Sequence, residues 1–188
     1  MLDRIKLKLI VVGLVASIFS MMGQDSLAYY STIGKATNVV TSGDVSFIIH
    51  EKTDQGKDFP EDGVYVMPGD VVSKQVSIES ICNHPFYLRV KLVDGVDNKA
   101  LSSEDCLKLD IDTKNWELHD GWYYYKKIVK PNETTPSVFS HVEIIGSKVG
   151  MDYLGSTLTL TVKAQAVQSE HNPIKNGKTY TASGWPKE

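Results

Sequence analysis

The sequence has only two cysteines in 188 residues, which is too few for a disulfide-dense scaffold or a four-cysteine zinc site. It also lacks a large excess of charge: 20 basic residues face 23 acidic ones, for a net charge of −3. That balance argues against a polybasic nucleic-acid or membrane-surface binder. Walker, dinucleotide-binding, Gly-x-Ser-x-Gly and His-Glu-x-x-His motifs are absent as well. What remains, 41% hydrophobic and 23% charged residues, is typical of a folded globular protein.

The first 28 residues have the features of a secretory signal peptide. Three basic residues within the first eight precede a fourteen-residue apolar run, Leu9–Met22, and Ser26 and Ala28 supply the small-x-small cleavage site. The alternative is a membrane anchor, but fourteen helical residues span about 21 Å of a hydrocarbon core about 30 Å thick. We therefore expect a signal helix that is cleaved after Ala28, so that the secreted chain begins at Tyr29.

The remaining chain has the period-2 alternation of half-buried strands. The pattern is clear over residues 45–50, 75–79, 86–93 and 157–166, weaker over 122–129 and 138–145, and interrupted by Gly-Asp and Pro-Gly-Asp turns. One short helix is predicted over Glu104–Leu109, with Ser102 or Ser103 as N-cap. Antiparallel strands without alternating long helices predict an all-β fold, an antiparallel β-sandwich over residues 42–170. Residues 29–41 precede it, and residues 171–188 are expected to form a loose tail from which Trp185 can dock.

The titratable residues do not form a recognisable catalytic or metal-binding motif. None of the five histidines has a partner at metal-ligand spacing, so we expect no metal site and no catalytic residue; they are His50, His84, His119, His141 and His171. Asp110 and Asp112 share one strand face, where they either contact a cation or are simply solvated.

Two further features of the sequence leave alternatives open. A bridge between Cys82 and Cys106 would close a 25-residue loop worth about 3–4 kcal/mol, but spacing does not decide whether it forms. The aromatic run Trp122–Tyr125 fits either a carbohydrate platform or strand packing, and strand packing is the commoner use of such residues.

Several stretches together resemble the TasA/camelysin family of SipW-dependent exported proteins, and most of all the BsaA-type biofilm matrix proteins. The resemblance covers most of residues 28–168. It is carried, in chain order, by Leu27–Thr32, Thr41–Phe47, Met67–Asp70 with the strand after it, Asp120–Lys127 with Lys130–Pro136, and Thr157–Gln168 followed by a distant tryptophan.

The resemblance implies a secreted structural protein with a jelly-roll-like β-sandwich. It implies cleavage by a SipW-type signal peptidase and polymerisation into extracellular fibres, in the matrix or on the surface of a Gram-positive bacterium. The implied partners are further copies of the chain and other matrix components, with no nucleic acid and no cofactor. Camelysin-type members are also classed as metallopeptidases, but this sequence lacks a metal-ligand cluster, so we expect no enzyme. The alternatives are a monomeric secreted adhesion or binding module and a camelysin-type metallopeptidase.

Residues 29–41 are the candidate assembly strand. In family fibres the N-terminal segment of one subunit completes a sheet of the next, and this segment is too short and polar to form a core of its own. Strand parity places Ile33, Lys35, Thr37 and Val39 on one face. The residues expected to carry the pairing are Tyr30, Ile33, Lys35, Thr37, Val39 and Val40. A strand given to a neighbour makes a head-to-tail contact that does not close, which produces a filament.

Overall fold

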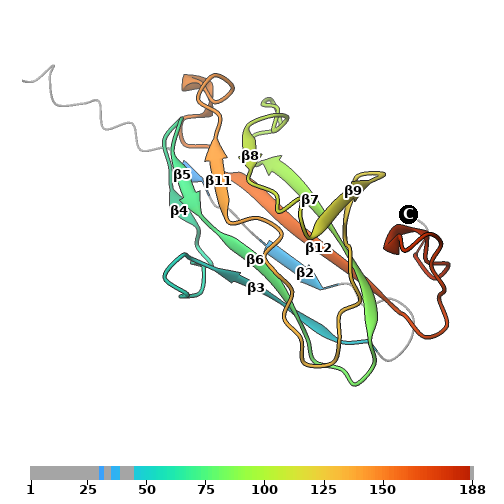
Figure 1. The fold of residues 1–188 in the computed structure, drawn as a ribbon. Coiled ribbons are helices and arrows are strands. Elements are labelled where there is room, and N and C mark those ends of the chain that lie inside the picture. The colour runs from blue at the N-terminus through green and yellow to red at the C-terminus, as the bar shows by residue number, and fades with distance from the viewer. Residues whose placement is uncertain (1–29, 32–34, 39–44, 187–188) are drawn as a thin grey trace, which may run out of the picture.

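The computed structural model describes residues 30–31, 35–38 and 45–186. In this part the chain is mostly β and forms several antiparallel sheets, as Figure 1 shows. The helical content of the described residues consists of two 3-10 turns, η1 (Met151–Tyr153) and η2 (Thr179–Thr181). No helix among these residues is long and apolar enough to cross a membrane.

The largest sheet has five strands. In spatial order they are β2 (Lys35–Asn38), β12 (Leu158–Gln168), β7 (Phe86–Val96), β10 (Trp122–Tyr125) and β9 (Trp116–His119). β12 and β7 pair antiparallel along their whole length, from Leu158 opposite Val96 to Gln168 opposite Phe86. β9 and β10 form a hairpin whose two-residue turn, Asp120–Gly121, has φ angles of 48° and 76°. Positive φ at both positions is what an Asp-Gly hairpin turn requires.

The other strands form three smaller sheets. They are β5 (Val71–Ser73), β11 (His141–Ile144) and β8 (Leu107–Leu109) in one sheet, β3 (Phe47–Lys52) and β6 (Gln75–Ser80) in another, and β1 (Tyr30–Ser31) with β4 (Val64–Tyr65) in the last. The segment leading into β11 joins two of these sheets. In it, the Val138 N–H donates to the Val76 carbonyl at 2.7 Å and the Thr135 N–H donates to the Ile78 carbonyl at 2.8 Å.

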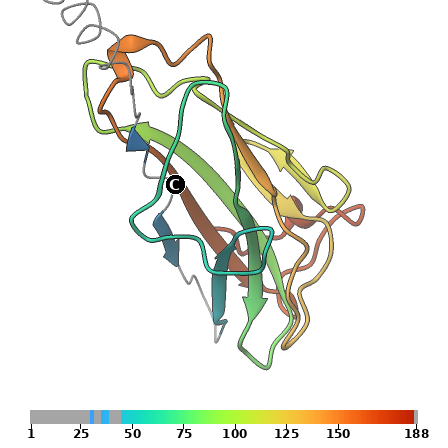
Figure 2. The ribbon, with the colours of Figure 1, turned by 90° about the vertical axis from the view of Figure 1, so that its left-hand side faces the viewer.

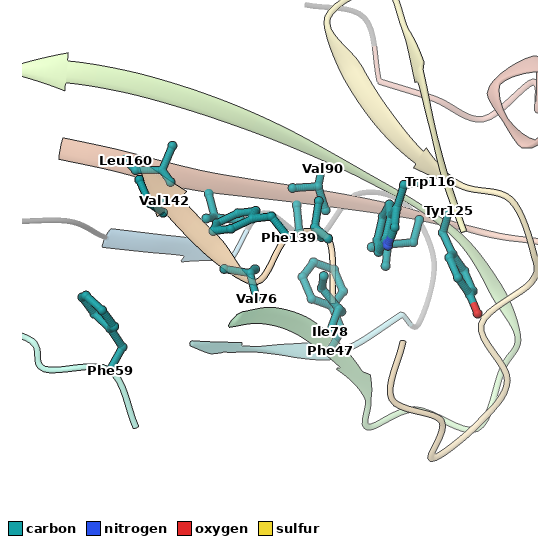
Figure 3. Close-up of a cluster of buried hydrophobic side chains, with 14 of the residues drawn as sticks. Phe47, Phe59, Val76, Ile78, Val90, Trp116, Tyr125, Phe139, Val142 and Leu160 are labelled. Carbon is teal, nitrogen blue, oxygen red and sulfur yellow. The ribbon is translucent and has the colours of Figure 1, made fainter. Parts of the chain in front are cut away.

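One hydrophobic cluster lies among these sheets. Every second residue of β12 from Leu158 to Ala166 is buried, while the residues between them are more exposed, which confirms the predicted alternation. The buried side chains of β12 and β7 meet those of β3, β6 and β11, as Figure 3 shows for Leu160, Val90, Ile78 and Val142. Burying an aliphatic or aromatic side chain of this size is worth about 1.5–3 kcal/mol, so this cluster supplies most of the stability.

The predicted helix over Glu104–Leu109 is wrong. Residues 104 and 105 lie in a turn, and Leu107–Leu109 form β8, which pairs antiparallel with β11. Ser102 does act as a cap, because its hydroxyl accepts the Glu104 N–H at 3.1 Å, but the cap belongs to the turn. A six-residue helix is marginal by itself, and pairing with β11 gives the same backbone groups partners in a sheet.

The C-terminal residues 174–186, here called the C-terminal segment, pack on the outer face of the five-stranded sheet (Figure 1). The alternation in β7 predicts solvent-facing Tyr87 and Arg89, yet both are buried. Tyr87 packs with Ala182 and Trp185 of the segment, while the Arg89 guanidinium lies over the Trp185 ring at 4.8 Å. The tail is therefore anchored through Trp185, as the sequence allows.

Candidate assembly surface

The N-terminal strands pair with two separate parts of the fold. β2 runs parallel to β12, with Lys35 opposite Thr161 and Asn38 opposite Ala164. β1 runs antiparallel to β4, with Tyr30 opposite Tyr65. β2 also contacts β3, so it lies where the edge of the five-stranded sheet meets the β3–β6 pair (Figures 1 and 2).

β12 is held in place by β7 and on its inner face, so the edge that faces β2 can pair with an added strand. Its opposite edge is paired with β7 over all eleven residues, and its inward side chains belong to the hydrophobic cluster. Among the described residues, β2 pairs with Thr161–Ala164 of the edge that faces it. The edge of a sheet is a ready template for an added strand.

The predicted assembly residues are only partly within the described chain. Lys35 and Thr37 lie in β2 and Tyr30 lies in β1. The other predicted residues of the cleavage site and the strand lie outside the described residues: Ser26, Ala28, Tyr29, Ile33, Val39 and Val40. The sequence analysis did not identify β12 as the partner. The only available signal was that residues 157–166 have the longest regular alternation in the chain.

A groove of about 480 Å³ opens on the five-stranded sheet, with a lining that reaches from the β9–β10 hairpin across β7 to Leu160 of β12. It lies between β8, an end strand of the three-stranded sheet, and the β9–β10 hairpin. Its lining combines apolar and aromatic side chains with acidic and hydroxylated ones: Leu92, Leu107, Leu109, Leu118, Tyr123 and Leu160, with Asp94, Ser102, Ser103, Glu104 and Asp105. We name it the leucine groove. The sequence analysis missed it, because its residues come from five separate segments.

Three histidines are paired with carboxylates. His50 Nε2 lies 2.6 Å from Glu79 Oε2, His119 Nε2 lies 3.2 Å from Asp120 Oδ2, and His141 Nδ1 lies 2.9 Å from Asp110 Oδ2. Each contact joins two side chains at a different place on the molecule. Over residues 45–186, whose side chains the structure describes, no group of three or more His, Cys, Asp or Glu residues could hold a metal ion.

The carboxylates of Asp110 and Asp112 are both occupied by local hydrogen bonds. Asp110 Oδ1 accepts the backbone N–H groups of Ser140 and His141, each at 2.7 Å, and Asp112 accepts from Lys114 and Asn115. Burial raises the pKa of Asp110, but the bonds from His141 and Ser140 outweigh it and hold the pKa below its usual range. The side-chain bond from Asn115 likewise lowers the pKa of Asp112. Asp110 thus holds the start of β11, and Asp112 holds the turn before β9.

The two cysteines are free thiols in different surroundings. Cys82 is half-buried and its thiol donates to the His84 carbonyl at 3.3 Å. Cys106 is buried and its thiol donates to the Ser102 carbonyl at 3.3 Å. The structure does not join them in the disulfide considered from the sequence.

The aromatic run of β10 serves packing on both faces of the sheet. Tyr125 packs on Trp116 in the hydrophobic cluster, with ring centroids 5.3 Å apart. On the outer face, the guanidinium of Arg89 lies 4.2 Å from the Trp122 ring and donates to the Tyr124 hydroxyl at 3.0 Å. Trp122 and Tyr124 are both buried there, so neither presents a ring face to a carbohydrate.

A fully buried lysine forms an ion pair with Glu51 of β3. Lys74, at the break between β5 and β6, places Nζ 2.9 Å from Glu51 Oε2 and 4.3 Å from the centre of the Phe59 ring. Burial lowers the pKa of Lys74, and the attraction and hydrogen bond of Glu51 act in the opposite direction. Glu51 thus supplies the counter-charge for a lysine inside the fold.

Comparison with protein-family models, curated proteins and solved structures gives no match to this chain. The functional argument therefore depends on the sequence features and the geometry described above.

Proposed function

We propose that this chain is a secreted structural protein that polymerises into extracellular fibres of a bacterial biofilm matrix, by donating its N-terminal strand to the next subunit. The observation that carries the proposal is the pairing of β2 with the edge of β12. The pairing consists of main-chain contacts at the rim of the sheet, and the same contacts form equally well with the strand of a second copy.

The proposal includes a β-sandwich of jelly-roll type as the body of each subunit. It is supported by the cluster of side chains shared between the five-stranded sheet and the β3, β6 and β11 strands. Among the residues whose side chains the structure describes, that cluster extends from Val45 to Ala166, and in this proposal the body folds without the segment before it. Exchange of the strand between copies would then cost little stability.

Export and cleavage supply the trigger in this proposal. While the signal peptide is attached, the membrane holds the segment that begins at Tyr29; cleavage by a SipW-type peptidase after Ala28 releases it for pairing. The chain acts outside a Gram-positive cell, has no enzymatic activity and needs no cofactor. Its partners are copies of itself, with other matrix components around the fibre. Mass spectrometry of the secreted protein should give Tyr29 as the first residue, and an intact Met1 would contradict this step.

The decisive experiment compares fibre yield by electron microscopy with folding by far-ultraviolet circular dichroism. Deletion of residues 29–39 should leave a folded protein that does not polymerise. Ile33→Pro and Ala36→Pro should act similarly, because proline lacks the N–H donor and fixes φ. Ala36→Val keeps the N–H and is the matched control that should polymerise. Undiminished fibres from the folded deletion variant would show that assembly uses another surface, and a wild-type protein that stays monomeric would favour a binding module.

A further inference from the structure

The loop after β10, residues 126–130, presents an apolar side chain among lysines. Its base is fixed, because Val129 and Phe86 exchange two main-chain hydrogen bonds, at 2.9 and 3.0 Å, and Val129 is buried. Ile128 beside it is 40% exposed, and Lys127 and Lys130 are exposed. We name residues 126–130 the lysine loop.

The leucine groove has the complementary character. Leu118 in its lining is 59% exposed, and removing that apolar surface from water would be favourable. Asp94 and Glu104 at its rim are exposed and acidic, while Asp105 is already within 3.4 Å of Lys148. A groove lined by leucines and by acidic residues together fits an apolar side chain that is flanked by lysines.

The groove and the loop of one copy cannot meet. The lysine loop is fixed at Phe86, where β7 begins, and the groove includes Asp94, eight residues further along the same strand. At about 3.3 Å per residue this separation is about 26 Å. Figures 1 and 2 agree that the loop after β10 and the loop after β7 lie toward opposite ends of the molecule.

We propose that the lysine loop of one copy docks in the leucine groove of a second copy, with Ile128 among the leucines and Lys127 and Lys130 beside Asp94 and Glu104. This inference rests on the proposed function, to which it adds a second contact between subunits. The two surfaces are different patches of one chain, so the contact is heterologous and extends into a filament. Its charges would also guide subunits into register before strands exchange.

Charge reversal tests the docking in purified secreted protein. The loop variant, Lys127→Glu/Lys130→Glu, and the rim variant, Asp94→Lys/Glu104→Lys, should each weaken self-association about tenfold in sedimentation velocity, because like charges then face each other. An equal mixture of the two variants should recover wild-type association, since each variant's loop then opposes the other's groove. A chain that carries all four substitutions should also recover it. Wild-type association should weaken as ionic strength rises.

The controls change charge equally at sites away from both surfaces. Lys57→Glu/Lys175→Glu and Asp58→Lys/Glu61→Lys should associate as the wild type does, and circular dichroism should show that every variant is folded. Unchanged association of the loop and rim variants, or a loss that mixing does not restore, would overturn the docking. Wild-type protein that associates without forming fibres would contradict the proposed function and leave the docking supported. Wild-type protein that remains monomeric at every concentration would contradict both.

Discussion

Removal of Glu51 should destabilise the fold far more than removal of a comparable surface carboxylate. The side chain of its partner, Lys74, is 0% exposed, whereas that of Glu51 is 17% exposed. Glu51→Leu would leave the ammonium of Lys74 buried without this counter-charge. Breaking a buried pair in this way costs about 3–5 kcal/mol of unfolding free energy, because the attraction and the hydrogen bond of the carboxylate are lost where water cannot replace them.

The reciprocal change should cost less. Lys74→Met removes the buried ammonium and places an apolar side chain beside Phe59, but it leaves the Glu51 carboxylate, whose Oε1 is buried without a hydrogen-bond partner. Because the Glu51 side chain is 17% exposed and that of Lys74 is 0% exposed, we expect the smaller loss, about 1–3 kcal/mol. In the double variant, Glu51→Leu/Lys74→Met, no charge remains buried. Its stability should exceed that of Glu51→Leu alone, since an apolar pair of similar volume often replaces a buried ion pair without loss.

Urea unfolding, followed by circular dichroism at a concentration below that of fibre formation, measures these differences. The control pair is Lys108–Glu143, which has nearly the same separation, 3.0 Å, but side chains that are 68% and 40% exposed. Glu143→Leu should cost less than about 1 kcal/mol. If Glu51→Leu costs no more than this control, the reasoning that Lys74 carries a buried charge is refuted.

The same pair predicts a pH dependence. Because burial lowers the pKa of Lys74 below its ordinary 10.5, the folded state binds fewer protons than the unfolded state between the two values. The free energy of unfolding should therefore gain a positive contribution as pH rises through this window. Lys74→Met should remove that contribution, and a wild-type profile identical to that of the variant would contradict the assignment.

Three further predictions concern the C-terminal segment, the stability of the fold at low pH and the two thiols. Trp185→Ala should cost about 1–2 kcal/mol and speed proteolysis within residues 174–186, because it removes the ring over Arg89; unchanged cleavage would contradict the anchoring. Asp110→Asn should lower the free energy of unfolding at neutral pH. The difference from the wild type should shrink as pH falls through the lowered pKa of Asp110, because the wild-type carboxylate then loses its charge as well. A difference that does not change with pH would contradict this prediction. A thiol reagent should label Cys82 in the native protein and Cys106 only after unfolding, whereas two thiols released only by reductant would show a bridge.

Strand positions are the part of the fold that local sequence predicts well. The alternation in residues 86–93 and 157–166 marks β7 and β12 because it records which side chains each strand buries, and that property needs no knowledge of the partner. Turn chemistry is equally local, as the Asp120–Gly121 hairpin shows. The expected assembly strand, residues 29–41, includes the residues of β2, but it is inferred from the family resemblance and from its place after the cleavage site.

The tertiary structure decided which segments meet. Leu107–Leu109 became a strand, against a weak helical pattern, because β11 offers it hydrogen bonds from residues more than thirty positions away. Tyr87 and Arg89 are buried because the C-terminal segment returns over them, which no alternation in β7 can signal. The groove likewise combines residues from separate segments, and β2 finds its partner more than 120 positions along the chain. Local sequence encodes what each segment can bury, whereas the choice among possible partners is made by the total area buried when all of them pack together.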